Sequence, residues 1–277
     1  MKGSFTGLIL LTFLILPFSA KGENPTDEFK KATSFYKRYA TAAGPIHVWK
    51  PAGYNHKTAG TVIYAHGYYI DADKAWKNHR LAKQFADSKK NAIFIVPEVP
   101  SDFEEHIPWT TFDKLLLYAK KAGVVFPKGR VVVMGHSGAY RTIVKWLPSK
   151  QINEIYLLDA LYLNHEDFKK WALKRKSNRL IALSELTYKK SLLLMKDVKT
   201  AVLKGSMPDD GEFTEKEKKA DILVIKSQYD HFAMIETMKV IPSILNLSKL
   251  LNIKKASVTE KKPTEKKQTE PQISEIH

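Results

Sequence analysis

The sequence predicts an α/β fold with a mostly parallel central sheet and helices on both of its faces. Two observations lead to this prediction. Short runs of β-branched and apolar residues recur along the chain, and stretches with helical spacing of apolar residues separate most of them. The expected strands are residues 46–49, 61–65, 92–96, 130–134, 154–158, 180–183 and 222–225.

The expected helices alternate with these strands. The stretch 112–122 shows the pattern clearly, because Leu115, Leu116 and Ala119 recur on one helical face. Functional residues of such sheets lie where the strands end, so the residues that follow each strand are the candidates for a site. The other expected helices are 76–85, 140–147, 168–174, 188–195 and 232–251.

The two ends of the chain are expected to lie outside this domain, which then covers residues 23–253. Residues 1–22 read as a secretory signal peptide, with Lys2, an apolar run over 8–18 and small residues at Ala20 and Gly22. The run is too short for a membrane anchor, because as a helix it spans about 16 Å of a ~30 Å hydrocarbon core. Residues 254–277 are rich in Lys, Glu, Thr and Pro, which predicts a disordered tail. The protein is therefore expected to be exported, either periplasmic or secreted.

The composition excludes several kinds of protein. The 277 residues contain no cysteine, which rules out disulfide scaffolds, thiolate zinc sites and a cysteine nucleophile. The formal charge is +16, with 45 Lys+Arg against 29 Asp+Glu. Nucleic acid is not an expected partner, because the charge is scattered and no recognition motif occurs. Electrostatic contact with an anionic envelope surface is the expected use of this charge.

The most informative stretch is Gly135-His-Ser-Gly-Ala139, which follows a run of valines and precedes a helical segment. A serine on a tight strand-to-helix turn projects its hydroxyl above the sheet, where a base can reach it. Ser137 is therefore the candidate nucleophile. The backbone N–H of Gly138 then points to the place where an oxyanion would form.

With this motif the body resembles the α/β-hydrolase family, over residues 46–251. The motif here is Gly-x-Ser-x-Ala, a mild departure, since Ala139 stands where the family has glycine. The resemblance implies a second oxyanion donor, the N–H of Gly67 or of Tyr68, because His66-Gly67-Tyr68 directly follows the strand 61–65. It also implies the order serine, acid, histidine along the chain. A lid in this fold would be small.

His231 and an acid complete the constellation that the resemblance implies. His231 follows the last expected strand, where the family has its histidine, and could take the proton of Ser137. Asp159 and Glu185 each end or follow a later strand, and the family places its acid after either strand. Asp159 is preferred because an aspartate that ends an apolar strand needs a specific partner, and Glu185 is the second candidate.

Aromatic residues near these strand ends could form an apolar pocket for a substrate. The candidates are Tyr69, Trp109 and Phe232. No phosphate-binding loop, dinucleotide fingerprint or His-Glu-x-x-His motif occurs, so neither a cofactor nor a metal is expected.

The sequence thus predicts an exported serine hydrolase that cleaves an ester or related acyl substrate through an acyl-enzyme intermediate. Two alternatives remain open. The same groups could cleave an amide, as in an amidase or peptidase, because the bond cleaved depends on the shape of the pocket. The chain could also be a non-catalytic protein that binds the envelope through its basic surface.

Overall fold

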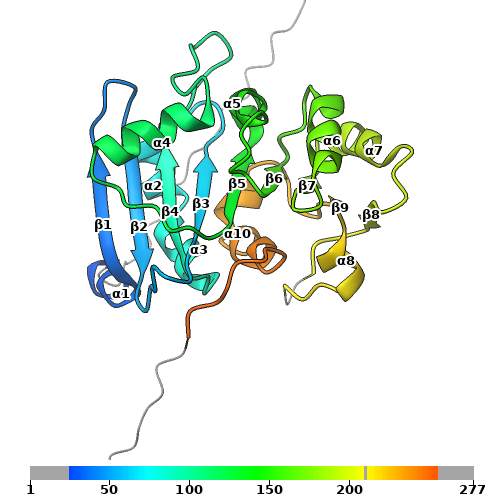
Figure 1. The fold of residues 1–277 in the computed structure, drawn as a ribbon. Helices are drawn as coiled ribbons and strands as arrows, with labels where there is room; N and C mark the ends of the chain where they lie inside the picture. Colours follow the sequence, from blue (N-terminus) through cyan, green and yellow to red (C-terminus); the bar gives the residue numbers. More distant parts are fainter. Residues whose placement is uncertain (1–24, 209–210, 255–277) are drawn as a thin grey trace, which may run out of the picture.

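A nine-stranded sheet runs through the whole molecule (Figure 1), in the order β1-β2-β4-β3-β5-β6-β7-β9-β8. The computed structural model describes residues 25–208 and 211–254; the expected signal peptide, and the tail after Lys254, lie outside them. The strands are β1 (Thr33–Tyr39), β2 (Ile46–Pro51), β3 (Gly60–Ala65), β4 (Ala92–Pro97), β5 (Val131–His136), β6 (Glu154–Leu158), β7 (Arg179–Ser184), β8 (Val202–Lys204) and β9 (Ile222–Lys226).

The sheet is mostly parallel, as the sequence predicted. Strand β2 pairs antiparallel with both β1 and β4, and all strand pairs from β4 to β8 are parallel. All seven expected strands are present, with bounds that differ by no more than two residues. The sequence did not predict β1 and β8, the two edge strands. Both are partly exposed, and β8 is only three residues long, so neither has the apolar run of a buried strand.

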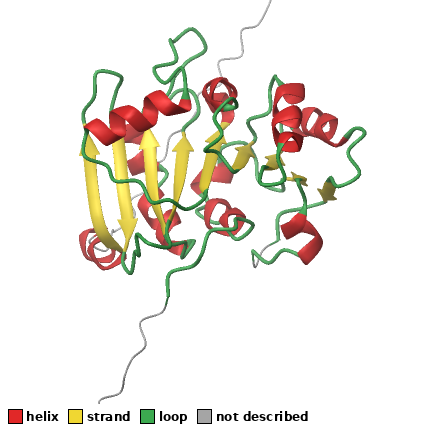
Figure 2. Cartoon of the chain, in the orientation of Figure 1, coloured by secondary structure: helices red, strands yellow, loops and turns green. Residues whose placement is uncertain are grey.

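Helices cover both faces of the sheet (Figure 2), in agreement with the predicted fold class. Two segments expected as single helices are each divided, because Arg80 and Met238 have left-handed backbones with φ of 49° and 58°. The helices are α1 (Pro25–Ala32), α2 (Ala72–Asn78), α3 (Leu81–Asp87), α4 (Phe112–Lys121), α5 (Tyr140–Trp146), α6 (His165–Lys174), α7 (Tyr188–Leu192), α8 (Glu215–Lys219), α9 (Ala233–Glu236) and α10 (Val240–Leu245).

The core consists of two apolar layers, one on each face of the sheet. Alternate residues of a strand point to opposite faces, so Ile95 of β4 joins the layer under α4, α5 and α6. Its neighbour Phe94 joins the layer under α3 and α10, where its ring stacks on Phe85 at 4.2 Å. Burial on both faces explains why the central strands are continuous apolar runs.

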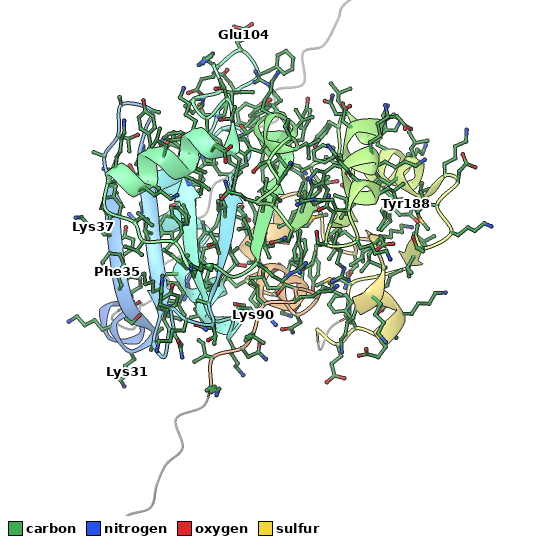
Figure 3. The ribbon with its side chains drawn as sticks, viewed as in Figure 1. Lys31, Phe35, Lys37, Lys90, Glu104 and Tyr188 are labelled. Carbon is green, nitrogen blue, oxygen red and sulfur yellow. The ribbon has the colours of Figure 1, made fainter. Side chains whose placement is uncertain are left out.

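The loops that leave the parallel strands gather at one edge of the sheet. Glu104, labelled in Figure 3, lies on the loop after β4 at this carboxyl edge, whereas Lys90, just before β4, lies at the opposite edge. Between β6 and β7 the described chain forms only α6 and short loops, so no lid is inserted there. None of the described helices is long and apolar enough to span a bilayer.

Candidate active site

The turn from β5 into α5 holds Ser137 in an unusual backbone conformation. Ser137 has φ of 52°, in the left-handed region that a residue with a side chain seldom adopts. It begins a short 3₁₀ turn, Ser137–Ala139, that leads directly into α5. A Cβ at Gly135 would clash with Ile143 of α5 and lie 3.0 Å from the Cβ of Ala139. Small residues at 135 and 139 therefore let α5 pack closely against the strand, which leaves the serine at the carboxyl edge.

The structure brings together three of the residues expected from the sequence. The Nε2 atom of His231 lies 2.9 Å from the Oγ atom of Ser137. Its Nδ1 atom lies 2.7 Å from the Oδ2 atom of Asp159. Because the carboxylate can only accept, Nδ1–H of His231 donates to Asp159, and Nε2 is left to accept the serine hydroxyl proton.

Asp159 is a fully buried carboxylate that accepts several hydrogen bonds. Besides His231, its donors are the backbone N–H groups of Glu185, Leu186 and Thr187 and the hydroxyl of Thr187, at 2.8–3.2 Å. Burial raises the pKa of Asp159, but the hydrogen bonds from His231, Thr187 and Glu185 outweigh it and lower the pKa to about 2. Asp159 is therefore ionised at neutral pH.

Glu185, the second candidate acid, also lies at the site, but it contributes its backbone and not its carboxylate. Strands β6 and β7 are neighbours, so their ends meet. The side chain of Glu185 is exposed, and its backbone N–H donates to Asp159 at 3.0 Å. Of the two candidate acids, only Asp159 has its carboxylate on His231.

His136 supports the loop that carries His231, which the sequence did not reveal. Its Nε2–H donates to the backbone oxygen of His231 at 2.8 Å, and the centres of the two rings lie 4.5 Å apart. Burial, and next the proximity of His231, lower the pKa of His136 to about 3. His136 is therefore neutral at pH 7, and its ring fixes the main chain of His231.

Replacing His136 with glutamine is expected to reduce the decrease in the free energy of unfolding as the pH falls. The pKa of His136 is about 3 in the folded protein and 6.5 as a free group, so between these values the unfolded chain binds more protons. The free energy of unfolding therefore falls as the pH drops below 6.5, by about 2 kcal/mol at pH 5. Glutamine keeps a donor at the position of Nε2 but does not titrate. Urea unfolding between pH 7 and pH 5 measures how steeply the free energy of unfolding falls in the native protein and in His136→Gln. The same dependence on pH in both proteins would contradict a lowered pKa for His136.

The residues expected to form an oxyanion site lie together around Ser137. A Cβ at Gly67 would lie 2.9 Å from the Cβ of Ser137 and 3.0 Å from Nδ1 of His136. A Cβ at Gly138 would clash with the ring of Tyr68. Within the described residues the backbone N–H of Tyr68 has no protein acceptor. The two loops therefore meet at the serine, and only glycine fits at 67 and 138 without displacing a neighbour.

The fully buried His66 and the partly exposed Glu98 fix the loop that carries Gly67 and Tyr68. The ring of His66 contacts the backbone oxygen of Gly67 through Nδ1 at 2.8 Å and the carboxylate of Glu98 through Nε2 at 3.0 Å. The other oxygen of Glu98 accepts the backbone N–H of Ala72 at 3.1 Å. Both ends of the loop are thus attached to the end of β4. An acid directly after an apolar strand was the only sequence signal for this role of Glu98.

The three aromatic residues expected to form a pocket differ in their exposure to solvent. Tyr69 is 88% exposed, and Phe232 is 56% exposed with its ring edge-on to His231 at 5.1 Å. The expectation for Trp109 is wrong, because Trp109 is fully buried and its indole N–H donates to the backbone oxygen of Glu98. Its indole belongs to the core under α4, where it has no surface to offer a substrate.

Tyr162 is a further residue at the site. It lies in the loop after β6, half-buried, with its ring edge-on to His231 at 6.4 Å. The pKa of Tyr162 is raised, mainly by burial and next by the charge of Asp159, while a hydrogen bond with Ser137 opposes the change. Its position three residues after Asp159 was the only sequence signal for it. In the part of the chain that the structure describes, no three His, Asp or Glu side chains gather in a way that could hold a metal ion.

Comparison with known proteins shows a shared fold. No protein-family model and no curated protein matches the sequence. A feruloyl esterase module from Clostridium thermocellum, solved with sinapinate, matches with a TM-score of 0.51 and 12% identity, over 78% of this chain and 91% of that one. A structure named FAE matches with a TM-score of 0.50 and 11% identity, over the same shares. S-formylglutathione hydrolase from Staphylococcus aureus has a TM-score of 0.48 and 13% identity, over 76% of this chain and 94% of that one.

Proposed function

We propose that this chain, which has the α/β-hydrolase fold, is a serine hydrolase that cleaves an ester or related acyl substrate. The observation that carries this proposal is the chain of hydrogen bonds from Ser137 through His231 to Asp159, at the carboxyl edge of the sheet. A histidine held between a hydroxyl and a buried carboxylate is the arrangement that activates a serine for attack on a carbonyl.

The proposed reaction has two halves. In the first, Oγ of Ser137 attacks the substrate carbonyl while Nε2 of His231 takes the hydroxyl proton. That proton then passes to the leaving alcohol, and the acyl group stays on the serine. In the second half His231 takes a proton from water, the hydroxide attacks the acyl-enzyme, and Ser137 regains its proton as the acid leaves. Asp159 stabilises the imidazolium in both halves.

The negative oxygen of each tetrahedral intermediate would be stabilised by backbone N–H groups. The donors in this proposal are Gly138 and, from the facing loop, Gly67 or Tyr68. Such donors act strongly because they are already in place before the charge develops. The contact between the ring of Tyr68 and Gly138 fixes the distance between the two loops.

The rim of the site indicates an apolar substrate group. Tyr69, Leu163, Leu186 and Phe232 lie on four separate loops at this edge, and each is more than half exposed. Large apolar side chains exposed at the rim of a site are typical of a binding surface. We therefore propose that the substrate presents an aliphatic or aromatic group to these side chains.

We also propose that the hydrolase is exported and acts outside the cytoplasm. Support comes from the sequence alone, namely the basic start, the apolar run and the small residues of 1–22. An excess of positive charge would favour contact with an anionic envelope surface at that location.

Labelling with a fluorophosphonate tests the proposed function. The phosphorus should become bonded to Oγ of Ser137, so that the native protein is labelled and Ser137→Ala is not. Ser206→Ala, which removes an exposed serine elsewhere, should be labelled like the native protein. A folded native protein that stays unlabelled would refute the hydrolase and favour a non-catalytic binding protein on this fold.

A further inference from the structure

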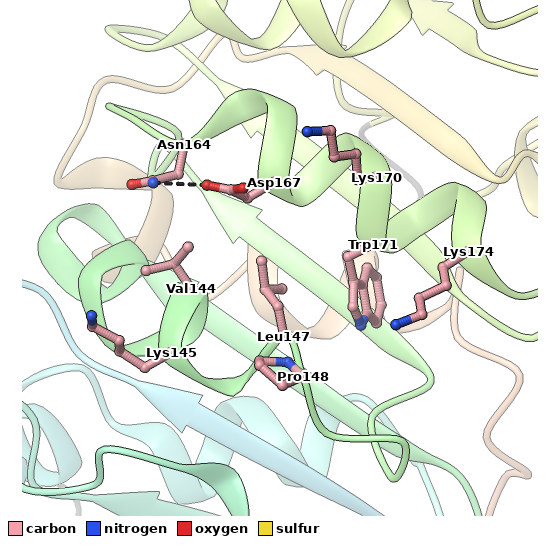
Figure 4. Close-up of a pocket in the computed structure, with 9 residues that line it drawn as sticks. All are labelled: Val144, Lys145, Leu147, Pro148, Asn164, Asp167, Lys170, Trp171 and Lys174. Atoms are coloured by element: carbon pink, nitrogen blue, oxygen red, sulfur yellow. Dashed lines mark hydrogen bonds between the residues drawn. The ribbon is translucent and has the colours of Figure 1, made fainter.

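A groove of about 500 Å³ separates α5 from α6 on one face of the sheet (Figure 4). Residues of α5 and of the turn that follows it form one side, and residues of α6 form the other. The groove does not include Ser137, His231 or Asp159. Its volume lies in the range of about 300–1,000 Å³ that is usual for small-molecule sites.

One side of the groove is apolar. Val144 and Leu147 contribute aliphatic groups, and Pro148 extends this surface past the end of α5. In Figure 4 the side chain of Trp171 extends from α6 toward Leu147 and Pro148. The indole face and the aliphatic groups could together contact the apolar part of a ligand.

The rim of the groove is positively charged. Lys145, Lys170 and Lys174 all line it, and all three are exposed. None of these lysines forms an ion pair within 4.0 Å with any residue that the structure describes. The one acid in the lining, Asp167, accepts a hydrogen bond from Asn164 at 2.9 Å. The groove therefore has two more positive than negative charges, and its ammonium groups are available to an anion.

A buried donor, on α6, also belongs to the lining of the groove. Trp171 is 4% exposed, and within the described residues its indole N–H has no acceptor. Buried N–H groups are nearly always hydrogen-bonded, so an unpaired one marks a place where an acceptor would bind favourably. In Figure 4 the flexible side chain of Lys174 extends toward the same end of the groove. The indole nitrogen itself has almost no accessible surface, so a small shift of the side chains around it would let an oxygen accept from the indole and pair with the ammonium group.

We propose that the groove between α5 and α6 is a second binding site, for a small organic anion with an apolar body. Lys174 and the indole N–H would hold a carboxylate or phosphate group, Lys145 and Lys170 would add to the positive charge that attracts it, and the aliphatic side would hold the body. An anion without an apolar body would leave the aliphatic side unused, and a neutral apolar molecule would leave the cations unpaired. This proposal does not depend on the hydrolase activity.

Binding is measured on the full chain with four probes: octanoate, octyl phosphate, inorganic phosphate and octanol. The readout is the indole N–H resonance of Trp171 in a proton–nitrogen correlation spectrum, assigned by its loss in Trp171→Phe. Octanoate or octyl phosphate is expected to shift this resonance saturably. Inorganic phosphate lacks the apolar body and octanol lacks the negative charge. Each should therefore need at least about tenfold higher concentration to produce the same shift. Comparing the two octyl compounds tells carboxylate from phosphate recognition.

Lysine variants decide whether the groove is the site. Lys170→Gln combined with Lys174→Gln should weaken binding of the better octyl anion at least about tenfold. Lys189→Gln combined with Lys190→Gln, a pair on α7 outside the groove, should leave it unchanged. No saturable shift, or equal weakening by both pairs, would overturn the proposal. Fluorophosphonate labelling at Ser137 is scored separately, so failure of one proposal is distinguishable from failure of the other.

Discussion

Asp159→Asn is expected to lower turnover of a p-nitrophenyl ester by about 10⁴-fold while the protein stays folded. The carboxylate of Asp159 accepts Nδ1–H of His231 at 2.7 Å, which leaves Nε2 free to accept the proton of Ser137. An asparagine amide can donate to Nδ1 instead, so Nε2 would carry the proton and could not act as a base. The donors of Glu185 and Thr187 bond to Oδ1 and can still bond to the amide oxygen, whereas the N–H of Leu186 bonds to Oδ2 and would lose its acceptor, so most of the local hydrogen bonds are kept.

The matched control is Glu185→Gln. The side chain of Glu185 is exposed, and its contribution to the site is a backbone N–H that the substitution retains. Turnover of this variant should stay within about twofold of the native protein. Initial rates for both variants settle the identity of the acid. A large loss in Glu185→Gln with little loss in Asp159→Asn would reverse the assignment.

The electrostatics of Asp159 also set the pH range for this experiment. Its pKa is about 2 in the folded protein, against 3.8 for the free group, so its ionised form contributes stability above pH 3.8. That contribution is lost as the pH falls from about 4 to about 2. At neutral pH the carboxylate is ionised, and rates measured there report the arrangement of the site rather than its protonation.

The candidate site could be located from the sequence because parallel strands place their ends at one edge. Ser137 and Asp159 directly follow the adjacent strands β5 and β6, and His231 comes from the loop after β9. The choice between Asp159 and Glu185 could not be derived in this way, because each follows a neighbouring strand. It depends on local backbone: Asp159 has a left-handed φ of 46°, and the 185–187 turn directs its N–H groups at the carboxylate.

Residues that act through packing were harder to foresee. Trp109 lies in a polar, proline-containing stretch after a strand, where the sequence predicted the wall of an apolar pocket, yet its indole is buried in the core. His136 occupies the variable position of the serine motif, where sequence does not distinguish an exposed side chain from a buried one. Only the fold shows that its ring bonds to the main chain of His231. The hydrophobic periodicity and the order of the strands thus placed the site at the carboxyl edge of the sheet. They did not predict which side chains at that edge are buried.

Gly138→Ala is expected to lower turnover by about 10²–10³-fold, the usual effect of losing one oxyanion donor. The new methyl group would clash with the ring of Tyr68. Because the hydroxyl of Tyr68 accepts from Arg141 at 3.2 Å, the ring is held at both ends and would move together with its loop. The backbone N–H groups of Gly67 and Tyr68 would then shift away from the developing charge on the substrate.

A second substitution separates the clash with the ring of Tyr68 from the lower backbone flexibility of alanine at position 138. Gly138→Ala combined with Tyr68→Ala removes the ring that the methyl group meets but keeps the backbone N–H of residue 68. If the cost comes from the displaced loop, the double variant should recover most of the loss, and the coupling between the two sites should be large. Gly205→Ala is the matched control, because a Cβ there would meet nothing within 4 Å. Initial rates and fluorophosphonate labelling measure the native protein and four variants, including the single Tyr68→Ala that the coupling requires. If Gly138→Ala has full activity, the contact with Tyr68 does not position the oxyanion donors, and the donor on the facing loop must be sought elsewhere.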